Sequence, residues 1–511
     1  MYLASQEKRC HFKLMTMHYH TLFATLLHST LGTVSVSNCV ALNGMHSAVL
    51  HFIHQCLSQH HDGEVSQRTV SWLFALINGV YFLGLAFGVI IMCGAAEKMG
   101  RKFCTVIIID LAVILCALLI ILAAWLHSLV LLFLARLLAG LSRPCGCFLP
   151  SYLNECCAKK DASYATASVQ VGSIAWQTLT SALAMPQLLG NYSLWQFILV
   201  PHACAALLHL VLAWTLLPES PRHLYITAQS PEAAGKAITY YQGKEINLVA
   251  ELAQLDREAE LVERQRKLSL TTVLTTKHLL WPFLLSIACG VADTDSGLIY
   301  VDAFSTSILC ASGVSTRNAA WLSFSTVMLP ALVTCPLGIW ATDRFSRRKF
   351  LLWGLAIMCS GCLLLIISGY CPSGVATVLA VISMMMISCS SWACLQNVTH
   401  IIPNEVCPQN VRSWSVGASL SVVNVLCALE VSLVHPLSQY IGSAAYTAIL
   451  VVGCCTWLFM FKCLPETKGV PLNVTVNRWK QPTEPLLDVA GPNSGSYGSV
   501  LYRRSSISSS D

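Results

Sequence analysis

Long apolar runs dominate this sequence and restrict the folds that the chain can adopt. Only 11% of the 511 residues are charged and the mean hydropathy is +0.62, whereas soluble domains contain about 25% charged residues. A helix of roughly 20 apolar residues crosses the hydrocarbon of a bilayer. We count about twelve such runs, near 21–43, 71–95, 103–126, 129–153, 163–189, 194–217, 279–309, 319–341, 350–370, 375–402, 414–436 and 443–464. The composition therefore predicts an all-α, multi-pass membrane protein.

The basic residues alternate between the two sides of these runs. Lys and Arg concentrate at 97–102, 159–160, 222–278 and 344–349 and in both tails, while the intervening loops contain almost none. Because basic loops stay in the cytosol, we expect both termini to be cytosolic. We also expect the protein to lie in the plasma membrane. The net charge of +6 is thus a sign of membrane topology, and we expect the lipid bilayer, not nucleic acid, as a partner.

Three acidic and basic motifs occur twice at a nearly constant separation. They are listed in pairs as Glu97–Lys102 with Asp343–Arg348, Glu155 with Glu405, and Pro218–Arg222 with Pro465–Gly469. Such duplication is typical of secondary transporters, whose two halves rock about a central site. We expect a cytosolic segment at 1–20, a six-helix bundle at 21–217, a linker with short helices at 218–277, a second bundle at 278–464 and a mostly disordered cytosolic tail at 465–511.

These motifs resemble those of the sugar porter branch of the major facilitator superfamily, which contains the facilitative hexose transporters. Pro-Glu-Ser-Pro-Arg at 218–222 and Pro-Glu-Thr-Lys-Gly at 465–469 are similar to motifs that follow the sixth and twelfth spans in that branch. The resemblance implies a fold of twelve transmembrane helices in two bundles, with charges at the cytosolic mouth acting as a gate. The residues assigned to that charge network are Arg101, Lys102, Arg136, Glu155, Glu219, Arg222, Asp343, Arg347, Arg348, Glu405, Arg412 and Glu466.

Polar residues inside the first group of spans are candidates for substrate contact. Gln170, Ser173 and Gln177 have the i, i+3, i+7 spacing of one helix face, and polar faces of membrane helices turn toward a cavity or a neighbouring helix. The resemblance implies that Gln170 contacts sugar. It also aligns Asn38 with a position that is Asp in proton-coupled sugar porters and Asn in uniporters, which favours facilitated diffusion.

The seventh span departs from the sugar porter pattern. In the sequence 293–299 only Ser296 and Gly297 match the branch, and its pair of glutamines is missing. On a continuous helix, Asp293, Ser296, Gly297 and Tyr300 would share one face. A carboxylate at this depth costs about 2.5–3.5 kcal/mol on insertion scales. Asp293 is therefore a candidate for substrate binding or proton coupling, or else an aspartate nearer the external surface.

The tenth span provides the last candidates. Trp392, Gln396 and His400 recur at i, i+4 and i+8, so a regular helix would align them on one face. The resemblance places the branch's glutamate at Trp392 and its tryptophan at His400. His400 is equally compatible with helix packing and with ligand contact.

The most direct interpretation is a facilitative carrier of a hexose or a related small polar solute. Two alternatives stay open: an organic-ion carrier of the same fold, proton-coupled through Asp293, and a nutrient sensor that does not transport. The spacing of the His and Cys residues predicts no metal site, and we expect neither a cofactor nor enzymatic activity. In the tail, Tyr497–Val500 and Glu484–Leu487 fit sorting signals, so trafficking adaptors are expected partners.

Overall fold

The computed structural model describes residues 17–59, 65–264, 270–293, 297–342, 344–399, 401–407 and 409–468, and all regular structure in these ranges is helical. The first half comprises α2 (Tyr19–Thr30), η1 (Val34–Cys39), α3 (Ala41–Gly44), α4 (His46–Ser58), α5 (Gln67–Met99), η2 (Phe103–Ile108), α6 (Ile109–Trp125), α7 (Leu129–Ser142), α8 (Cys145–Cys156), α9 (Ala162–Leu183), η3 (Trp195–Phe197) and α10 (Val200–Leu216). The linker contains α11 (Pro221–Ile226), α12 (Pro231–Gln242), α13 (Leu248–Arg264) and α14 (Leu270–Thr275).

The second half repeats this arrangement. It comprises α15 (Lys277–Asp293), α16 (Leu298–Ala311), α17 (Thr316–Ser323), η4 (Phe324–Met328), α18 (Leu329–Thr342), α19 (Arg347–Ser368), α20 (Ser373–Ser390), η5 (Ser391–Leu395), α21 (Gln396–Thr399), α22 (Ile402–Val406), α23 (Gln409–Ile441), η6 (Gly442–Tyr446) and α24 (Thr447–Cys463). Within the described residues, eight helical segments are long and apolar enough to cross a membrane. Shorter pieces joined end to end, such as α7 with α8, complete the twelve spans.

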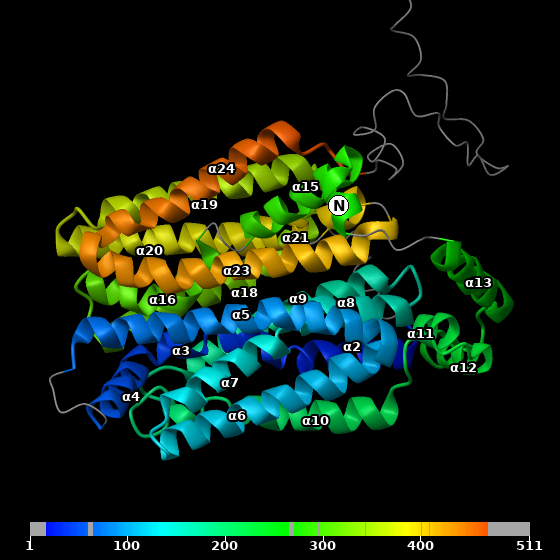
Figure 1. Ribbon diagram of the computed structural model, residues 1–511, viewed down its shortest axis with the longest axis horizontal. Helices are drawn as coiled ribbons and strands as arrows, with labels where there is room; N and C mark the ends of the chain where they lie inside the picture. Colours follow the sequence, from blue (N-terminus) through cyan, green and yellow to red (C-terminus); the bar gives the residue numbers. More distant parts are fainter. Residues whose placement is uncertain are drawn as a thin grey trace, which may run out of the picture.

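The long helices lie roughly parallel in two groups, one from each half of the chain (Figure 1). Helix α5 packs along α23, and α9 packs against α18, so the second and fifth spans of one half meet the eleventh and eighth of the other. Ser421 on α23 donates to the carbonyl of Ala86 on α5 at 3.1 Å across this boundary. The halves therefore contact each other mainly through these two helix pairs.

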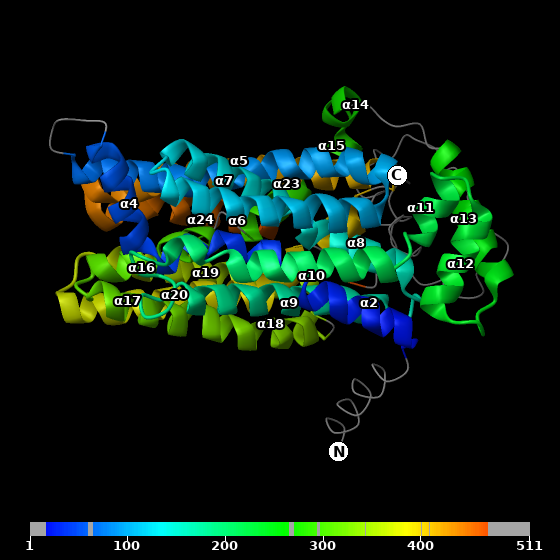
Figure 2. The ribbon, with the colours of Figure 1, turned by 90° about the horizontal axis from the view of Figure 1, so that it is seen from below.

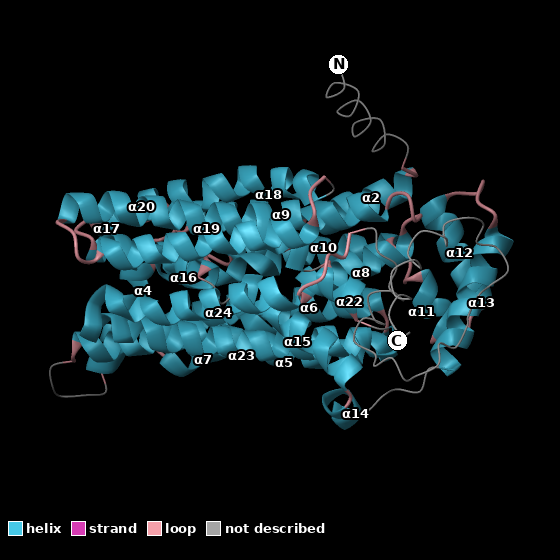
Figure 3. Cartoon of the chain, turned by 90° about the horizontal axis from the view of Figure 1, so that it is seen from above, coloured by secondary structure: helices cyan, strands magenta, loops and turns pink. Residues whose placement is uncertain are grey.

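The two ends of the molecule differ. Helices α11, α12 and α13 cover one end, whereas α4, α16 and α17 lie at the opposite end (Figures 2 and 3). Large apolar side chains such as Phe87, Val130, Val333 and Trp353 are exposed along the sides, as expected for a surface that faces lipid. The segment between the expected spans 21–43 and 71–95 contains the helix α4.

Candidate functional site

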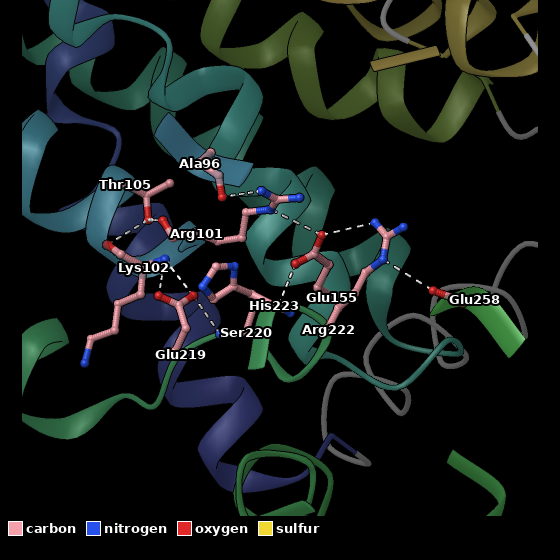
Figure 4. A network of polar contacts seen from close by, with 10 residues as sticks. All are labelled: Ala96, Arg101, Lys102, Thr105, Glu155, Glu219, Ser220, Arg222, His223 and Glu258. Atoms are coloured by element: carbon pink, nitrogen blue, oxygen red, sulfur yellow. Dashed lines mark hydrogen bonds and ion pairs between the residues drawn. The ribbon is translucent and has the colours of Figure 1, made fainter. Parts of the chain in front are cut away.

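Ion pairs gather where the first bundle meets the linker helices (Figure 4). Glu155 on α8 accepts from Arg101 at 3.4 Å and from Arg222 at 3.5 Å, and the Ser220 hydroxyl donates to its other oxygen at 2.5 Å. Arg222 also contacts Glu258 on α13 at 3.3 Å. This cluster thus connects α8, the loop after α5 and two linker helices within one half of the molecule.

Glu219 stabilises the start of the third span through backbone amides. Its carboxylate accepts from the Lys102 amide at 2.9 and 3.1 Å and from the Ser220 amide at 2.8 Å. An anion at a helix N-terminus satisfies free N–H groups and interacts favourably with the helix dipole. Burial lowers the pKa of the Lys102 ammonium, although Glu219 acts in the opposite direction. The Lys102 ammonium donates to the Trp214 carbonyl at 2.8 Å.

The second half contains an equivalent cap. Glu466 accepts from the amides of Arg347 at 3.2 Å and Lys468 at 3.1 Å and from the Ser346 hydroxyl. Burial alone would raise the pKa of Glu466, but these hydrogen bonds hold it below its usual value. Arg347 pairs with Glu405. Both duplicated motifs therefore place a glutamate at a helix start, beside an arginine that pairs with a second glutamate.

Other members of the predicted charge network are placed differently or lie outside the description. Arg348 donates to the Phe461 carbonyl at 2.6 Å and lies 5.9 Å from the centre of that ring. Asp343 falls outside the described residues, and the side chain of Arg412 is not described. The gating role of the whole set stays a prediction.

Arg136 does not join the charge clusters, because it lies deep within the first bundle. Its Nη1 donates to the Asn38 carbonyl at 2.7 Å, and Nη2 lies 3.5 Å from the Asn78 amide oxygen. The guanidinium is 4.8 Å from the centre of the Tyr81 ring, a favourable cation–π distance. The side-chain oxygen and nitrogen of Asn38 are buried without a hydrogen-bond partner in the described structure.

The polar face of the fifth span forms on α9 as a regular helix. Gln170 is half-buried, whereas Ser173 and Gln177 are buried. The Ser173 hydroxyl donates within its own helix to the Val169 carbonyl at 2.8 Å. The Gln177 oxygen has no hydrogen-bond partner among the described residues. Since α9 contacts η1, the helix of Gln177 and the turn of Asn38 are neighbours.

The seventh span is not a regular helix at Gly297, so Asp293 and Tyr300 do not share the continuous helix face that the spacing predicts. Helix α15 ends at Asp293, and α16 begins after Gly297, whose φ of +121° favours glycine. Ser296 falls outside the described residues. Asp293 is buried, which excludes an exposed surface aspartate, and Arg143 on the first half acts on it electrostatically. Arg143 was missed, although a cation inside a predicted span is a recognisable signal.

The tenth span also departs from a regular helix. Trp392 lies in η5, a π-helical turn, and Gln396 begins the next element, so the expected i, i+4 register does not apply. The Trp392 indole N–H is buried without a partner in the described structure, and Gln396 is half-buried. His400 lies outside the described residues.

A polar contact between the halves was not anticipated. At the end opposite α11–α13, the Asn43 amide donates to Ser305 at 2.6 Å and accepts from the Thr306 backbone at 3.1 Å. Ser305 is in turn hydrogen-bonded to Ser323 at 2.6 Å. Asn43 lies at the edge of the expected span 21–43, where a local pattern gives no signal for a contact with the other half.

A groove of about 1030 Å³ lies near the start of α2. It is lined by residues of α2, α12 and α13 and their flanks, including Tyr19, Tyr240, Lys244 and Leu248. This groove is therefore separate from the residues predicted to contact substrate.

The family is decided by comparison with known proteins. The profile of the sugar (and other) transporter family matches residues 24–479. The chain belongs to this family of sugar transporters. Facilitated glucose transporter member 7 of mouse, in solute carrier family 2, is 24% identical over 88% of each chain, and member 5 of horse is 23% identical over 84% of this chain and 86% of the relative. This sugar transporter is therefore a divergent member of the family.

Solved structures establish the fold of this sugar transporter. The proton:xylose symporter XylE bound to 6-bromo-6-deoxy-D-glucose superposes with a TM-score of 0.69 at 17% identity, over 90% of this chain and 99% of that chain. An inward-open XylE structure from E. coli gives the same TM-score at 16% identity, over 90% of this chain and 100% of that one. The expected major facilitator fold of two six-helix bundles is confirmed. The sorting signals of the tail lie outside the described residues.

Proposed function

We propose that this sugar transporter carries a hexose or a related small polar solute by facilitated diffusion. The observation that carries the proposal is a set of buried amide atoms without a hydrogen-bond partner among the described residues, namely the side-chain nitrogen and oxygen of Asn38 and the side-chain oxygen of Gln177. A buried polar atom without a partner costs about 1–3 kcal/mol. Sugar hydroxyls both donate and accept hydrogen bonds, so they would satisfy these atoms.

The surroundings of Arg136 support passive transport. Its partner in η1 is the backbone carbonyl of Asn38. The side chain of an asparagine does not ionise at the pH of the solutions on either side of the membrane. A proton taken up at this position would require a carboxylate. Movement of solute down its own gradient is therefore the simplest mode.

Contacts at the two ends of the molecule support an alternating-access mechanism. Asn43 joins the halves at one end, while the ion pairs of Glu155 and of Glu405 each form within one half at the other. A carrier needs two states that differ by only a few kcal/mol, and a small number of hydrogen bonds across one end suits this requirement. We place the α11–α13 end and both termini in the cytosol and the protein in the plasma membrane.

An organic-ion carrier is the second candidate, because Asp293 is buried in the seventh span. Arg143 already supplies a positive charge to this carboxylate, so a cationic substrate is not required to compensate it. The non-transporting sensor is distinguished from both carriers by the absence of flux.

Uptake into liposomes tests the proposal directly. The purified full-length protein is reconstituted, and the entry of radiolabelled D-glucose and D-fructose is followed with and without a pH gradient. We expect saturable entry that stops at equal concentrations on both sides and is accelerated by unlabelled sugar inside. Accumulation driven by the pH gradient, or flux of an organic cation such as tetraethylammonium without sugar flux, would contradict the proposal. Binding of sugar without flux would support a sensor.

A further inference from the structure

Three ionisable side chains form a hydrogen-bonded chain inside the first bundle. Asp110 on α6 contacts His209 on α10 with 2.7 Å between Oδ2 and Nδ1. The other ring nitrogen of His209 lies 2.9 Å from Nδ1 of His28 on α2. All three residues have an exposed fraction of 0%, and each comes from a different helix. The substrate candidates and the charge clusters do not include any of them.

The hydrogen-bond pattern makes this chain a proton acceptor. With both histidines neutral, His28 donates to His209, His209 donates to the Asp110 carboxylate, and the group has a net charge of −1. A proton added to Nε2 of His28 allows the proton on its Nδ1 to pass to His209. The product is a His209 imidazolium between the Asp110 carboxylate and a neutral His28, and the net charge is zero. Because a lone charge is costly at this depth, binding one proton removes a penalty.

Two further atoms indicate where the added proton enters. Nε2 of His28 and Oδ1 of Asp110 are buried without a hydrogen-bond partner in the described structure. The His28 ring lies edge-on to Tyr152 with 5.3 Å between ring centres, and the Tyr152 hydroxyl is 2.9 Å from that of Tyr241 on α12. Lys102 also acts electrostatically on His28. The proton-accepting end therefore faces the side of the molecule that carries α11–α13.

The depth of the three residues agrees with this direction. His28 and His209 lie roughly 10–14 Å along α2 and α10 from the end nearest α11–α13, at 1.5 Å per residue. Asp110 is the second residue of α6 and lies seven residues after the start of η2, which leads into α6 from the same end. A short path through Tyr152 and Tyr241 therefore separates the site from water at this end.

We propose that Asp110, His209 and His28 form a proton-binding site that adjusts the rate of the carrier to the pH at the α11–α13 side. With the proton bound, His209 donates from both nitrogens, and charge-assisted hydrogen bonds are the stronger kind. Helix α2 is then held more firmly to α10. Because α2 leads directly into η1, which carries Asn38, this attachment slows the movement of a substrate-contacting turn.

His202 also connects α10 to η1, the segment that follows α2, but no carboxylate takes part in its hydrogen bonds. It lies two turns before His209 on α10 and contacts the hydroxyls of Ser37 at 2.9 Å and Thr180 at 2.8 Å. These partners are neutral, so His202→Gln removes a buried imidazole while leaving the proposed proton site intact. It is the matched control for the experiments below.

Proton binding is tested without reference to any substrate. Infrared difference spectra of the reconstituted full-length protein are recorded between about pH 5 and 8, the range in which histidines titrate. We expect a carboxylate and imidazole transition that Asp110→Asn and His209→Asn both remove and that His202→Gln retains. His28→Asn keeps the donor toward His209 but removes Nε2, so it provides a second variant if one of the others fails to fold. A transition that persists unchanged in Asp110→Asn and His209→Asn would overturn the proposal.

The effect on rate rests on the proposed function and is measured separately. Exchange of labelled for unlabelled D-glucose in liposomes is followed at fixed external pH while the pH at the α11–α13 face is varied. We expect exchange to slow about fivefold in acid, the difference between a charged and a neutral hydrogen bond, and Asp110→Asn to be insensitive to pH. An unaltered pH response in Asp110→Asn would refute the regulatory role. Failure of sugar exchange in the wild type would refute the proposed function but leave the infrared test decisive.

Discussion

Gly100→Ala tests the helix cap of the first half most directly. Gly100 has φ +104° and ψ 157°, a region that only glycine adopts readily and that costs another residue about 1–3 kcal/mol. An added Cβ would clash with Oε2 of Glu219, so the carboxylate must leave the Lys102 amide. Losing a cap costs about 0.5–2 kcal/mol. Together, the substitution should destabilise the protein by about 1.5–5 kcal/mol.

Gly94→Ala is the matched control for this substitution. An added Cβ at Gly94 meets no atom within 4 Å, and alanine is favoured over glycine inside a helix by about 1 kcal/mol. The assay is the thermal midpoint of the detergent-solubilised protein, followed by tryptophan fluorescence. We expect the midpoint of Gly100→Ala to fall clearly below that of the wild type while Gly94→Ala stays level or rises. Equal midpoints for the two variants would refute the reasoning about the cap.

Three further predictions concern acid stability, closure and substrate contact. Because the pKa of Glu466 is held below its usual value, the helix cap that it forms stabilises the fold at neutral pH and is lost as the pH falls below about 4. Glu466→Gln should therefore make the thermal midpoint depend less on pH in this range. An unchanged pH dependence would count against the cap. Asn43→Ala removes two hydrogen bonds between the halves, about 0.5–1.5 kcal/mol each, so spin-label distances across that end should lengthen, whereas an unaltered distribution would contradict its role in closure. Gln177→Leu should raise the KM for transported sugar about two- to twelvefold, the equivalent of one hydrogen bond. Gln196, whose side-chain amide donates to the Ser193 carbonyl, provides the control, and Gln196→Leu should leave the KM unchanged. Equal KM values for the two variants would show that Gln177 is not part of the substrate site.

The two halves form the same kind of helix cap with different residues. In the first half, Gly100 brings the backbone close to Glu219, and in the second, Ser346 has an ordinary φ of −64° and donates its hydroxyl to Glu466. The motif comparison identified the glutamates but described them as members of a charge network. Their backbone hydrogen bonds show that both also fix helix starts, a role that the side-chain charge alone does not predict.

The sequence by itself determined the class of the protein. Hydropathy along the chain indicated the spans, and the duplicated motifs indicated two related halves. The distribution of Lys and Arg predicts an orientation in the membrane. These properties depend on residues that are close together in the chain or on composition, so a linear pattern records them. The regular polar face of α9 was predictable for the same reason.

Only the tertiary structure decided which polar residues meet. The break at Gly297 and the π-helical turn at Trp392 changed the faces expected for the seventh and tenth spans. The hydrogen-bonded chain from Asp110 through His209 to His28 joins three helices that are far apart in sequence. Contacts of this kind depend on the rotation and depth of each helix against its neighbours, which are set by packing of the whole bundle and not by any local pattern.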